Sequence, residues 1–368
     1  MDPIYLDHHA TTPVDPRVVE AMLPYFTDVF GNSSSVTHAQ GRKAANAVED
    51  ARIVIARFLG VQPNELTFTA GATESNNIAI NVEGHVITSA IEHKSVLNPA
   101  RRHEATVLMP DREGFISVDA VREAMRNDTR LVSIEAANGE IGTLQPIAAI
   151  GALCRERGIL FHTDATQALG KVPLDLTHVD LASFSAHKLY GPKGIGALFV
   201  RRGVRARPVM EGGGQEKGLR SGTVNVPGVV GFAAAVQLRR DEMADEAVRL
   251  TALRNDLWDR LAKEIEGVSV LGPRALRLPG NLSVTFERIE ADSLILAMRR
   301  FSLSSGSACS SGERGPSRLL TAIGAPEAAV INGAIRIGLG KSNTAEHIDM
   351  LVDDFKRAVA RLREISAA

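Results

Sequence analysis

The sequence predicts an α/β protein built around a mostly parallel sheet. Short apolar runs that read as strands alternate with segments of helical periodicity through the first part of the chain. The strand-like runs are 65–70, 85–90, 130–137, 158–164, 180–186 and 194–200. Because a helix between two strands returns the chain to the same end of the sheet, this alternation is typical of parallel strands.

The helical segments have the apolar faces that such a sheet needs. Between 44 and 58, apolar residues recur at the spacing of one buried helix face. Between 146 and 157, the apolar face includes Cys154, which we interpret as a packing residue. Helices with one apolar face pack against a sheet and leave their polar face to solvent.

A long helical pattern from about 229 to 265 predicts a helix that connects two domains. Strand-like runs at 281–287 and 334–340 and a final helix come after it. We therefore expect a large domain at 16–250 and a smaller α+β domain made of 1–15 and 251–368.

The composition excludes several classes of protein. The chain has 368 residues, 44% of them hydrophobic, and a net charge of -1, with no basic stripe to bind nucleic acid. Two cysteines form no disulfide framework, and the N-terminal stretch lacks the regions of a signal peptide, so we expect a cytoplasmic protein. No apolar run approaches the roughly 18 residues of a membrane span.

Polar residues follow nearly every predicted strand, at the edge where open α/β sheets bind ligands. The segment 71–75 would open a helix with exposed amides and the Thr73 hydroxyl, which suits a phosphate, although Thr and Ser cap many ordinary helices. Asp164 and Gln167 follow another strand, and Ser185, His187 and Lys188 follow the next.

The group around Lys188 points to one cofactor. Pyridoxal phosphate needs a lysine amine, phosphate donors, and a carboxylate that keeps its ring nitrogen protonated. Lys188, Ser185 with His187, and Asp164 supply these three functions. Alone, Lys188 would be interpreted as a solvated surface lysine.

Three further residues are weaker candidates. His93 follows the strand at 85–90 and could lie over a cofactor ring, but a lone histidine there is more often a helix-end residue. Asn138 offers an amide at the same edge. Arg336 lies within an apolar strand, where a substrate carboxylate or a structural salt bridge would explain it almost equally well.

The histidines also allow a metal-site interpretation. His162 and Asp164 lie two residues apart on a strand and therefore face the same side. No third ligand follows at a spacing typical of metal sites. The adjacent pair His8 and His9 could be ligands as well, but simple polar contacts are the more common role.

Cys309 is the most unusual residue of the sequence. It lies in a segment rich in Gly and Ser, 304–317, with few packing side chains, which predicts a mobile loop. A thiol displayed on such a loop is open to oxidation, so its reactivity is expected to be used.

These motifs together resemble a known family. The chain is similar to the class V aminotransferase superfamily, and within it to the cysteine desulfurases of the NifS/IscS type. The resemblance runs nearly end to end and rests on IYLDHHATTPVDPRV, TFTAGATESNN, ITSAIEHKSV, HTDATQALGK, SFSAHKLYGPKGIGALFVRR, GGGQEKGLRSGTVNV and SSGSACSSG. It implies the fold of aspartate aminotransferase-like pyridoxal-phosphate enzymes, known as fold type I.

The resemblance also implies a role for each site residue. Lys188 would carry the cofactor as a Schiff base, Asp164 would hold the ring nitrogen, and His93 would stack on the ring. Gln167 and Asn138 would tune the ring hydroxyl; Ala72, Thr73, Ser185 and His187 would bind the phosphate; Thr223 would add a phosphate contact from the other subunit of a homodimer; and Arg336 would clamp the substrate carboxylate.

Cys309 matches the nucleophile of these enzymes. The implied activity converts L-cysteine to L-alanine and passes the sulfur, as a persulfide on Cys309, to an acceptor protein such as an iron–sulfur scaffold or a sulfur carrier. A C–S lyase, a selenocysteine lyase or an aminotransferase of the same fold is the alternative. The chain departs from the family pattern at Gly139, where relatives commonly have a second Asn, and at its short C-terminal end.

Overall fold

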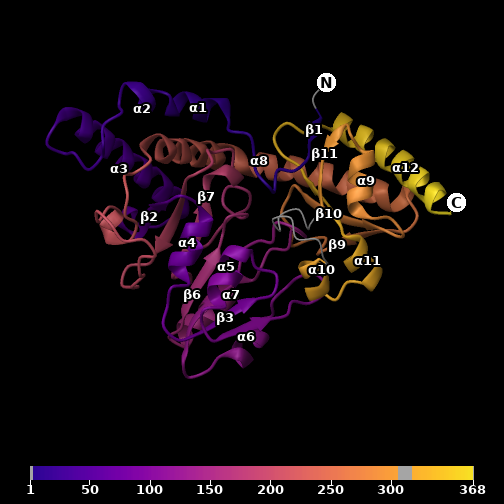
Figure 1. The fold of residues 1–368 in the computed structure, drawn as a ribbon, viewed down its shortest axis with the longest axis horizontal. Coiled ribbons are helices and arrows are strands. Elements are labelled where there is room, and N and C mark those ends of the chain that lie inside the picture. Colours follow the sequence, from indigo (N-terminus) through magenta and orange to yellow (C-terminus); the bar gives the residue numbers. More distant parts are fainter. Residues whose placement is uncertain (1–2, 306–316, 368) are drawn as a thin grey trace.

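A computed structural model describes residues 3–305 and 317–367. The predicted α/β fold is confirmed: a seven-stranded sheet with strand order β2-β8-β7-β6-β5-β3-β4 lies at the centre of the larger part (Figure 1). Its strands are β2 (Leu66–Thr69), β3 (His85–Ser89), β4 (Ala105–Leu108), β5 (Thr129–Ser133), β6 (Leu160–Asp164), β7 (Leu181–Ser185) and β8 (Gly196–Val200). Cys309 and residues 306–316 of the loop predicted around it lie outside the described residues, whereas Ser304 and Ser305, at the start of the predicted loop, form a short buried strand instead.

Two strands differ from the sequence prediction: β8 in its direction and β4 in its presence. β8 runs antiparallel to both β7 and β2, while the other neighbouring pairs are parallel. The short link between β7 and β8 explains this, because a parallel return needs a crossover of a dozen or more residues. β4 was not predicted, since this edge strand is mostly half-buried or exposed and has no continuous apolar run.

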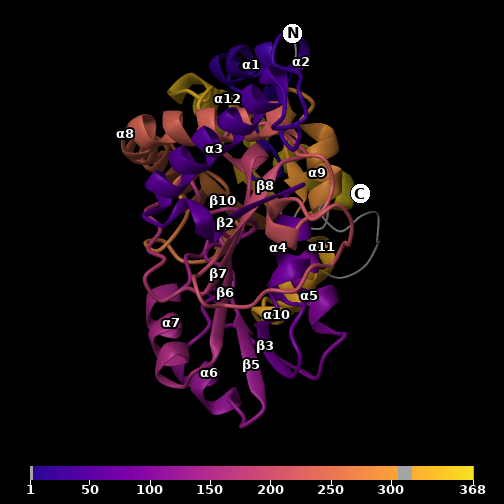
Figure 2. The same cartoon turned by 90° about the vertical axis from the view of Figure 1, so that its left-hand side faces the viewer.

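Helices cover both faces of this sheet. They are α1 (Pro16–Met22), α2 (Pro24–Thr27), α3 (Ala39–Leu59), α4 (Ala72–Ala79), α5 (Lys94–Ala100), α6 (Val118–Ala124), α7 (Ile147–Glu156) and α8 (Val226–Glu264). Short 3₁₀ helices lie at η1 (Pro63–Glu65), η2 (Ala186–Lys188) and η3 (Glu216–Gly218). Figure 2 shows α4 and α5 on one side of the strands and α7 on the other.

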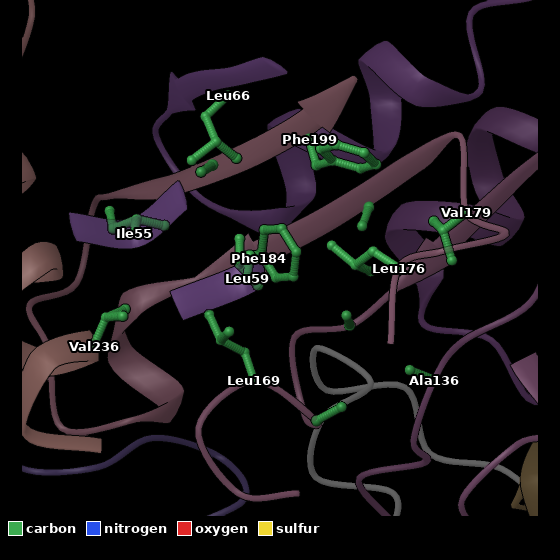
Figure 3. Packing of buried hydrophobic residues seen from close by; sticks show 14 of the residues in the cluster. Ile55, Leu59, Leu66, Ala136, Leu169, Leu176, Val179, Phe184, Phe199 and Val236 are labelled. Atoms are coloured by element: carbon green, nitrogen blue, oxygen red, sulfur yellow. The ribbon is translucent and has the colours of Figure 1, made fainter. Parts of the chain in front are cut away.

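Alternation along the strands separates two apolar layers. In β7, Leu181 faces the cluster that α4 and α5 complete, while Ala182 faces the larger cluster of α3, α6, α7 and α8. In β8, Leu198 and Phe199 divide in the same way. Figure 3 shows Phe184 and Phe199 of the larger cluster beside Ile55 and Leu59 of α3. Cys154 is fully buried there, which confirms its packing role.

A second, smaller sheet follows α8. Its strand order is β12-β13-β10-β9, and its strands are β9 (Val268–Leu271), β10 (Asn281–Phe286), β12 (Ser304–Ser305) and β13 (Ile335–Gly338). A parallel pair joins β1 (Ile4–Tyr5) to β11 (Phe301–Ser302). The helices of this part are α9 (Ala291–Ala297), α10 (Arg318–Ala322), α11 (Glu327–Asn332) and α12 (Ala345–Ala367).

The long helix α8 links the two parts, as Figure 1 shows. Its N-terminal half contributes Phe232 to the core of the large sheet, and its C-terminal half contributes Leu257 to a separate core with β10, β13 and α12. The domain boundary proposed at residue 250 falls inside this helix and stays a prediction. Among the described residues, no helix is both long and apolar enough to cross a membrane.

Candidate active site

A large cavity opens at the carboxyl ends of the parallel strands, where the sequence places its polar residues. Its volume is about 1330 Å³. It is lined by Ala72, Thr73, His93, Asn138, Asp164, Gln167, Ser185, His187, Lys188 and Arg336, which are all of the predicted site residues except Thr223 and Cys309. Thr223 lies exposed between η3 and α8 and does not line the cavity.

Lys188 ends the short helix η2, directly after β7. Its Nζ donates to the carbonyl oxygens of His9, at 2.8 Å, and Ala10, at 2.7 Å. The N-terminal segment thus crosses the cavity floor. From the sequence, only its two adjacent histidines were candidate ligands. The amine is held at the place where the strands converge on the cavity.

Asp164 is the last residue of β6 and its carboxylate is held by two donors. Asn76 of α4 donates to Oδ2 at 2.7 Å, and the Thr166 amide donates to Oδ1 at 3.0 Å. The residue is only 8% exposed. A buried, oriented carboxylate is suited to hold a protonated ring nitrogen. Sequence reasoning missed Asn76, which adjoins the phosphate-seat motif 71–75.

Contacts within the sheet, rather than a metal ion, account for the position of His162. Its ring nitrogens face Ser133 Oγ at 2.8 Å on β5 and Ser183 Oγ at 3.0 Å on β7. Burial lowers the pKa of His162 to about 4, so the imidazole is neutral near pH 7. Among the described residues, no group of three His, Cys, Asp or Glu side chains is arranged to hold a metal ion.

The segment predicted to bind phosphate lies at the start of α4. The helix begins at Ala72, and the first amides of a helix lack partners within it and attract anions. Gly71 precedes it with φ 152°, and a Cβ there would lie 3.7 Å from Ser185 Oγ. The backbones of Gly71 and Gly196 pack closely because Gly196 has no side chain: a Cβ there would lie 2.7 Å from the Gly71 Cα.

His187 lines the cavity beside the N-terminal segment. Its Nδ1 lies 3.0 Å from Thr11 Oγ1, and its carbonyl accepts from Thr12 Oγ1 at 3.0 Å. Burial, with a contribution from the charge of Lys188, lowers the pKa of His187 to about 4. The ring therefore offers one neutral N–H and one acceptor, and Thr11 determines its orientation.

Gln167 is tightly packed. Its Oε1 accepts from Lys171 Nζ at 2.7 Å, and its Nε2 donates to the His9 carbonyl at 2.9 Å. A Cβ on Gly139 would lie 2.7 Å from Gln167 Nε2, so the glycine makes room for this amide. Because the His9 carbonyl can only accept a hydrogen bond, the amide group that faces it must be Nε2, which is consistent with Oε1 accepting from Lys171.

His93 and Asn138 both line the cavity. His93 caps α5, and its Nδ1 accepts from the Ser95 amide at 3.1 Å while the ring is exposed to the cavity. Asn138 is 2% exposed, and its Oδ1 accepts from the amides of Glu140 and Ile141, both at 2.9 Å. Its Nδ2 donates to Glu135 Oε1 at 2.7 Å, so the amide is used largely within its own turn.

Acidic residues beside Asn138 give the cavity an unexpected carboxyl wall. Burial raises the pKa of Glu135 to about 8 and the pKa of Glu92 well above its usual range. Burial also raises the pKa of Glu140, while the charges of Arg336 and Arg318 oppose that shift. No sequence pattern indicates this cluster, because its members come from two separate turns.

Comparison with known proteins places this geometry in a family. The aminotransferase class-V family matches residues 4–351. Cysteine desulfurase IscS of Anaeromyxobacter sp. (strain K) is 48% identical over 99% of this chain and 94% of the relative. The chain therefore belongs to the class-V aminotransferases, and within them to the cysteine desulfurases of the NifS/IscS type. Enzymes of this family generally depend on pyridoxal phosphate.

Solved structures agree with this assignment. A NifS-like protein from Rickettsia africae superposes with a TM-score of 0.90 and 33% identity, over 97% of this chain and 99% of that chain. SspA in complex with cysteine superposes with a TM-score of 0.79 and 38% identity, over 91% of this chain and 98% of that chain. The predicted fold and family are both confirmed.

Proposed function

We propose that this chain is a pyridoxal-phosphate-dependent cysteine desulfurase. It would convert L-cysteine to L-alanine and leave the sulfur as a persulfide on Cys309. One observation carries the proposal: Lys188, Asp164, the anion seat at α4 and Arg336 line one cavity, although they come from four separate stretches of the chain.

The cavity contains the donor set that the cofactor needs. Lys188 would hold it covalently and Asp164 would hold its ring nitrogen. The amides at Ala72 and Thr73, with Ser185 and His187, would bind its phosphate. The bound cofactor withdraws electrons and so stabilises negative charge at the carbon next to the substrate amino group.

The chain's own residues would handle the substrate. Arg336 would bind the carboxylate of L-cysteine, and Lys188 would remove and return the proton at the α-carbon. The Cys309 thiolate would attack the substrate sulfur: an S–S bond forms, the C–S bond breaks, and the substrate carbon takes up a proton. The products are alanine and a persulfide on Cys309, so atoms and electrons balance.

We further propose a cytoplasmic homodimer that transfers this sulfur to an acceptor protein. SspA in complex with cysteine, a structural relative at 38% identity, supports cysteine as the substrate. The dimer would bring Thr223 of one subunit to the phosphate of the other. A monomer in sedimentation that binds the cofactor at full affinity would contradict this arrangement.

The experiment measures alanine, and sulfide released by dithiothreitol, from L-cysteine with the native protein, Cys309→Ala and Lys188→Ala. We expect both products from the native protein only. Cys309→Ala should retain the visible absorbance of the bound cofactor, and Lys188→Ala should lose the native band. Pyruvate in place of alanine, or undiminished turnover by Cys309→Ala, would establish a lyase.

A further inference from the structure

Arg336 is paired with an acidic residue from the other end of the sequence. Its Nη2 donates to Asp7 Oδ1 at 2.8 Å. The side chains of Arg336 and Asp7 are 3% and 19% exposed, so the pair is shielded from solvent. Arg336 lies in β13, an inner strand of the smaller sheet, opposite Ser283 of β10 and Ser304 of β12, and its side chain lines the cavity.

The backbone around Asp7 fixes this carboxylate in place. Gly338 of β13 donates to the Leu6 carbonyl at 2.7 Å, and its own carbonyl accepts from the His8 amide at 3.2 Å. The Tyr5 hydroxyl donates to the carbonyls of Asp7, at 3.1 Å, and Thr11, at 3.0 Å, across the turn that follows. Asp7 is therefore part of the smaller sheet rather than a loosely attached N-terminal residue.

A second carboxyl group lines the same cavity as Arg336. Glu140 lines the cavity, and the charges of Arg336 and Arg318 act on it. Within residues 3–305 and 317–367, the Glu140 carboxylate accepts no hydrogen bond, unlike Asp7. An arginine side chain has many rotamers and can reach carboxylates in different positions. A rigidly placed carboxylate such as that of Asp7 selects one of these rotamers.

We propose that Asp7 is a positioning residue that holds Arg336 away from Glu140, in the orientation that binds the substrate carboxylate. The proposal rests on the desulfurase function proposed above, in which Arg336 binds that carboxylate. A guanidinium has five N–H donors in a rigid fork, so a bond from Nη2 to Asp7 orients the fork and does not exhaust it. Without Asp7, Glu140 would compete with the substrate for Arg336.

The test compares two ligands that differ in the carboxylate. The cofactor-loaded Asp7→Asn variant is titrated with L-alanine, and separately with cysteamine, which has no carboxylate, and the cofactor absorbance reports binding. We expect the dissociation constant for L-alanine to rise about tenfold and that for cysteamine to change less than about twofold. The KM for L-cysteine should rise similarly, with kcat within about threefold.

Two further variants show whether Asp7 acts through Arg336 and Glu140. Adding Glu140→Gln to Asp7→Asn should restore most of the affinity for L-alanine. In an Arg336→Lys background, Asp7→Asn should have little further effect. Asp7→Glu, which keeps the charge, should bind L-alanine more tightly than Asp7→Asn, and it replaces Asp7→Asn in the comparison if that variant does not fold.

Equal weakening of both ligands by the Asp7 variants, or tighter L-alanine binding, would overturn the proposal. So would full additivity with Arg336→Lys. Because the titration needs no turnover, it separates the role of Asp7 from the proposed function. A protein that binds L-alanine through Asp7 and Arg336 yet makes no alanine from cysteine would contradict only the desulfurase activity.

Discussion

Asp164 and His93 are joined by a chain of three hydrogen bonds. Asn76 Nδ2 donates to Asp164 Oδ2 at 2.7 Å and to Ser95 Oγ at 2.8 Å, and Ser95 Oγ lies 2.7 Å from His93 Nδ1. An amide nitrogen only donates, so the Ser95 hydroxyl proton is directed to His93. The Ser95 amide also donates to Nδ1, which leaves the proton of the neutral imidazole on Nε2.

The first prediction concerns Ser95, which sets this tautomer. Ser95→Ala removes one of two donors to His93 Nδ1 and leaves the Asn76 amide with one acceptor fewer. We expect kcat for L-cysteine to fall about two- to tenfold, which corresponds to the loss of one hydrogen bond. Ser95→Thr keeps the hydroxyl and serves as the control. Unchanged ¹⁵N shifts of the His93 ring in Ser95→Ala would show that the tautomer does not depend on Ser95.

The second prediction concerns Gly139 and Gln167. In Gly139→Ala, the new Cβ would lie only 2.7 Å from the present position of Gln167 Nε2. The Gln167 amide must therefore move away from the His9 carbonyl. We expect weaker cofactor retention on dialysis. In a Gln167→Ala background the same substitution should cost little, because the obstructing amide is gone. Equal losses in both backgrounds would mean that Gly139 acts on another neighbour.

The third prediction concerns the stability of the large sheet. Arg52 of α3 and Glu216 of η3 form a buried pair at 2.8 Å, with side chains 6% and 5% exposed. Glu216 also accepts from the Phe68 amide at 2.7 Å. Glu216→Gln leaves the guanidinium with a weakened partner, so we expect the free energy of unfolding to drop by about 3 kcal/mol in urea denaturation.

The exposed pair of Glu83 and Arg207 offers the matched control for this substitution. Glu83→Gln removes the same charge from a solvated ion pair, and we expect no measurable change in the urea midpoint. A loss of similar size in both variants would mean that burial of the Arg52 pair is not the cause.

Sequence patterns predicted the parts of the site that lie on regular elements. Asp164 and Ser185 are the last residues of β6 and β7, and Lys188 follows three residues after β7 ends. Parallel strands bring their carboxyl ends to one edge, so the meeting of these residues in one cavity follows from the fold. The metal interpretation had the same origin, because His162 shares a strand face with Asp164. The sheet pairing, which the sequence pattern does not contain, places a serine on each neighbouring strand against the His162 imidazole.

Contacts made by irregular segments could not be predicted in this way. The N-terminal turn supplies the carbonyls that hold Lys188, 178 and 179 residues away in sequence, and the carboxylate that holds Arg336, 329 residues away. Loops have no periodicity, so nothing in the residues from Asp7 to Ala10 indicates which strand they will cross. The carboxyl wall of Glu92 and Glu135 was missed for the same reason.

The last prediction concerns pH and His162. Its pKa of about 4 in the folded protein lies below the usual 6.5, because burial disfavours the charged imidazole. Between these two values the unfolded chain binds more protons, so the free energy of unfolding rises with pH by up to about 1.4 kcal/mol per unit from this group. This contribution is complete above pH 6.5 and is lost as the pH falls toward 4. Urea denaturation at several pH values should show a smaller slope in His162→Asn than in the native protein, and an equal slope would show that this histidine is not the source of the pH dependence.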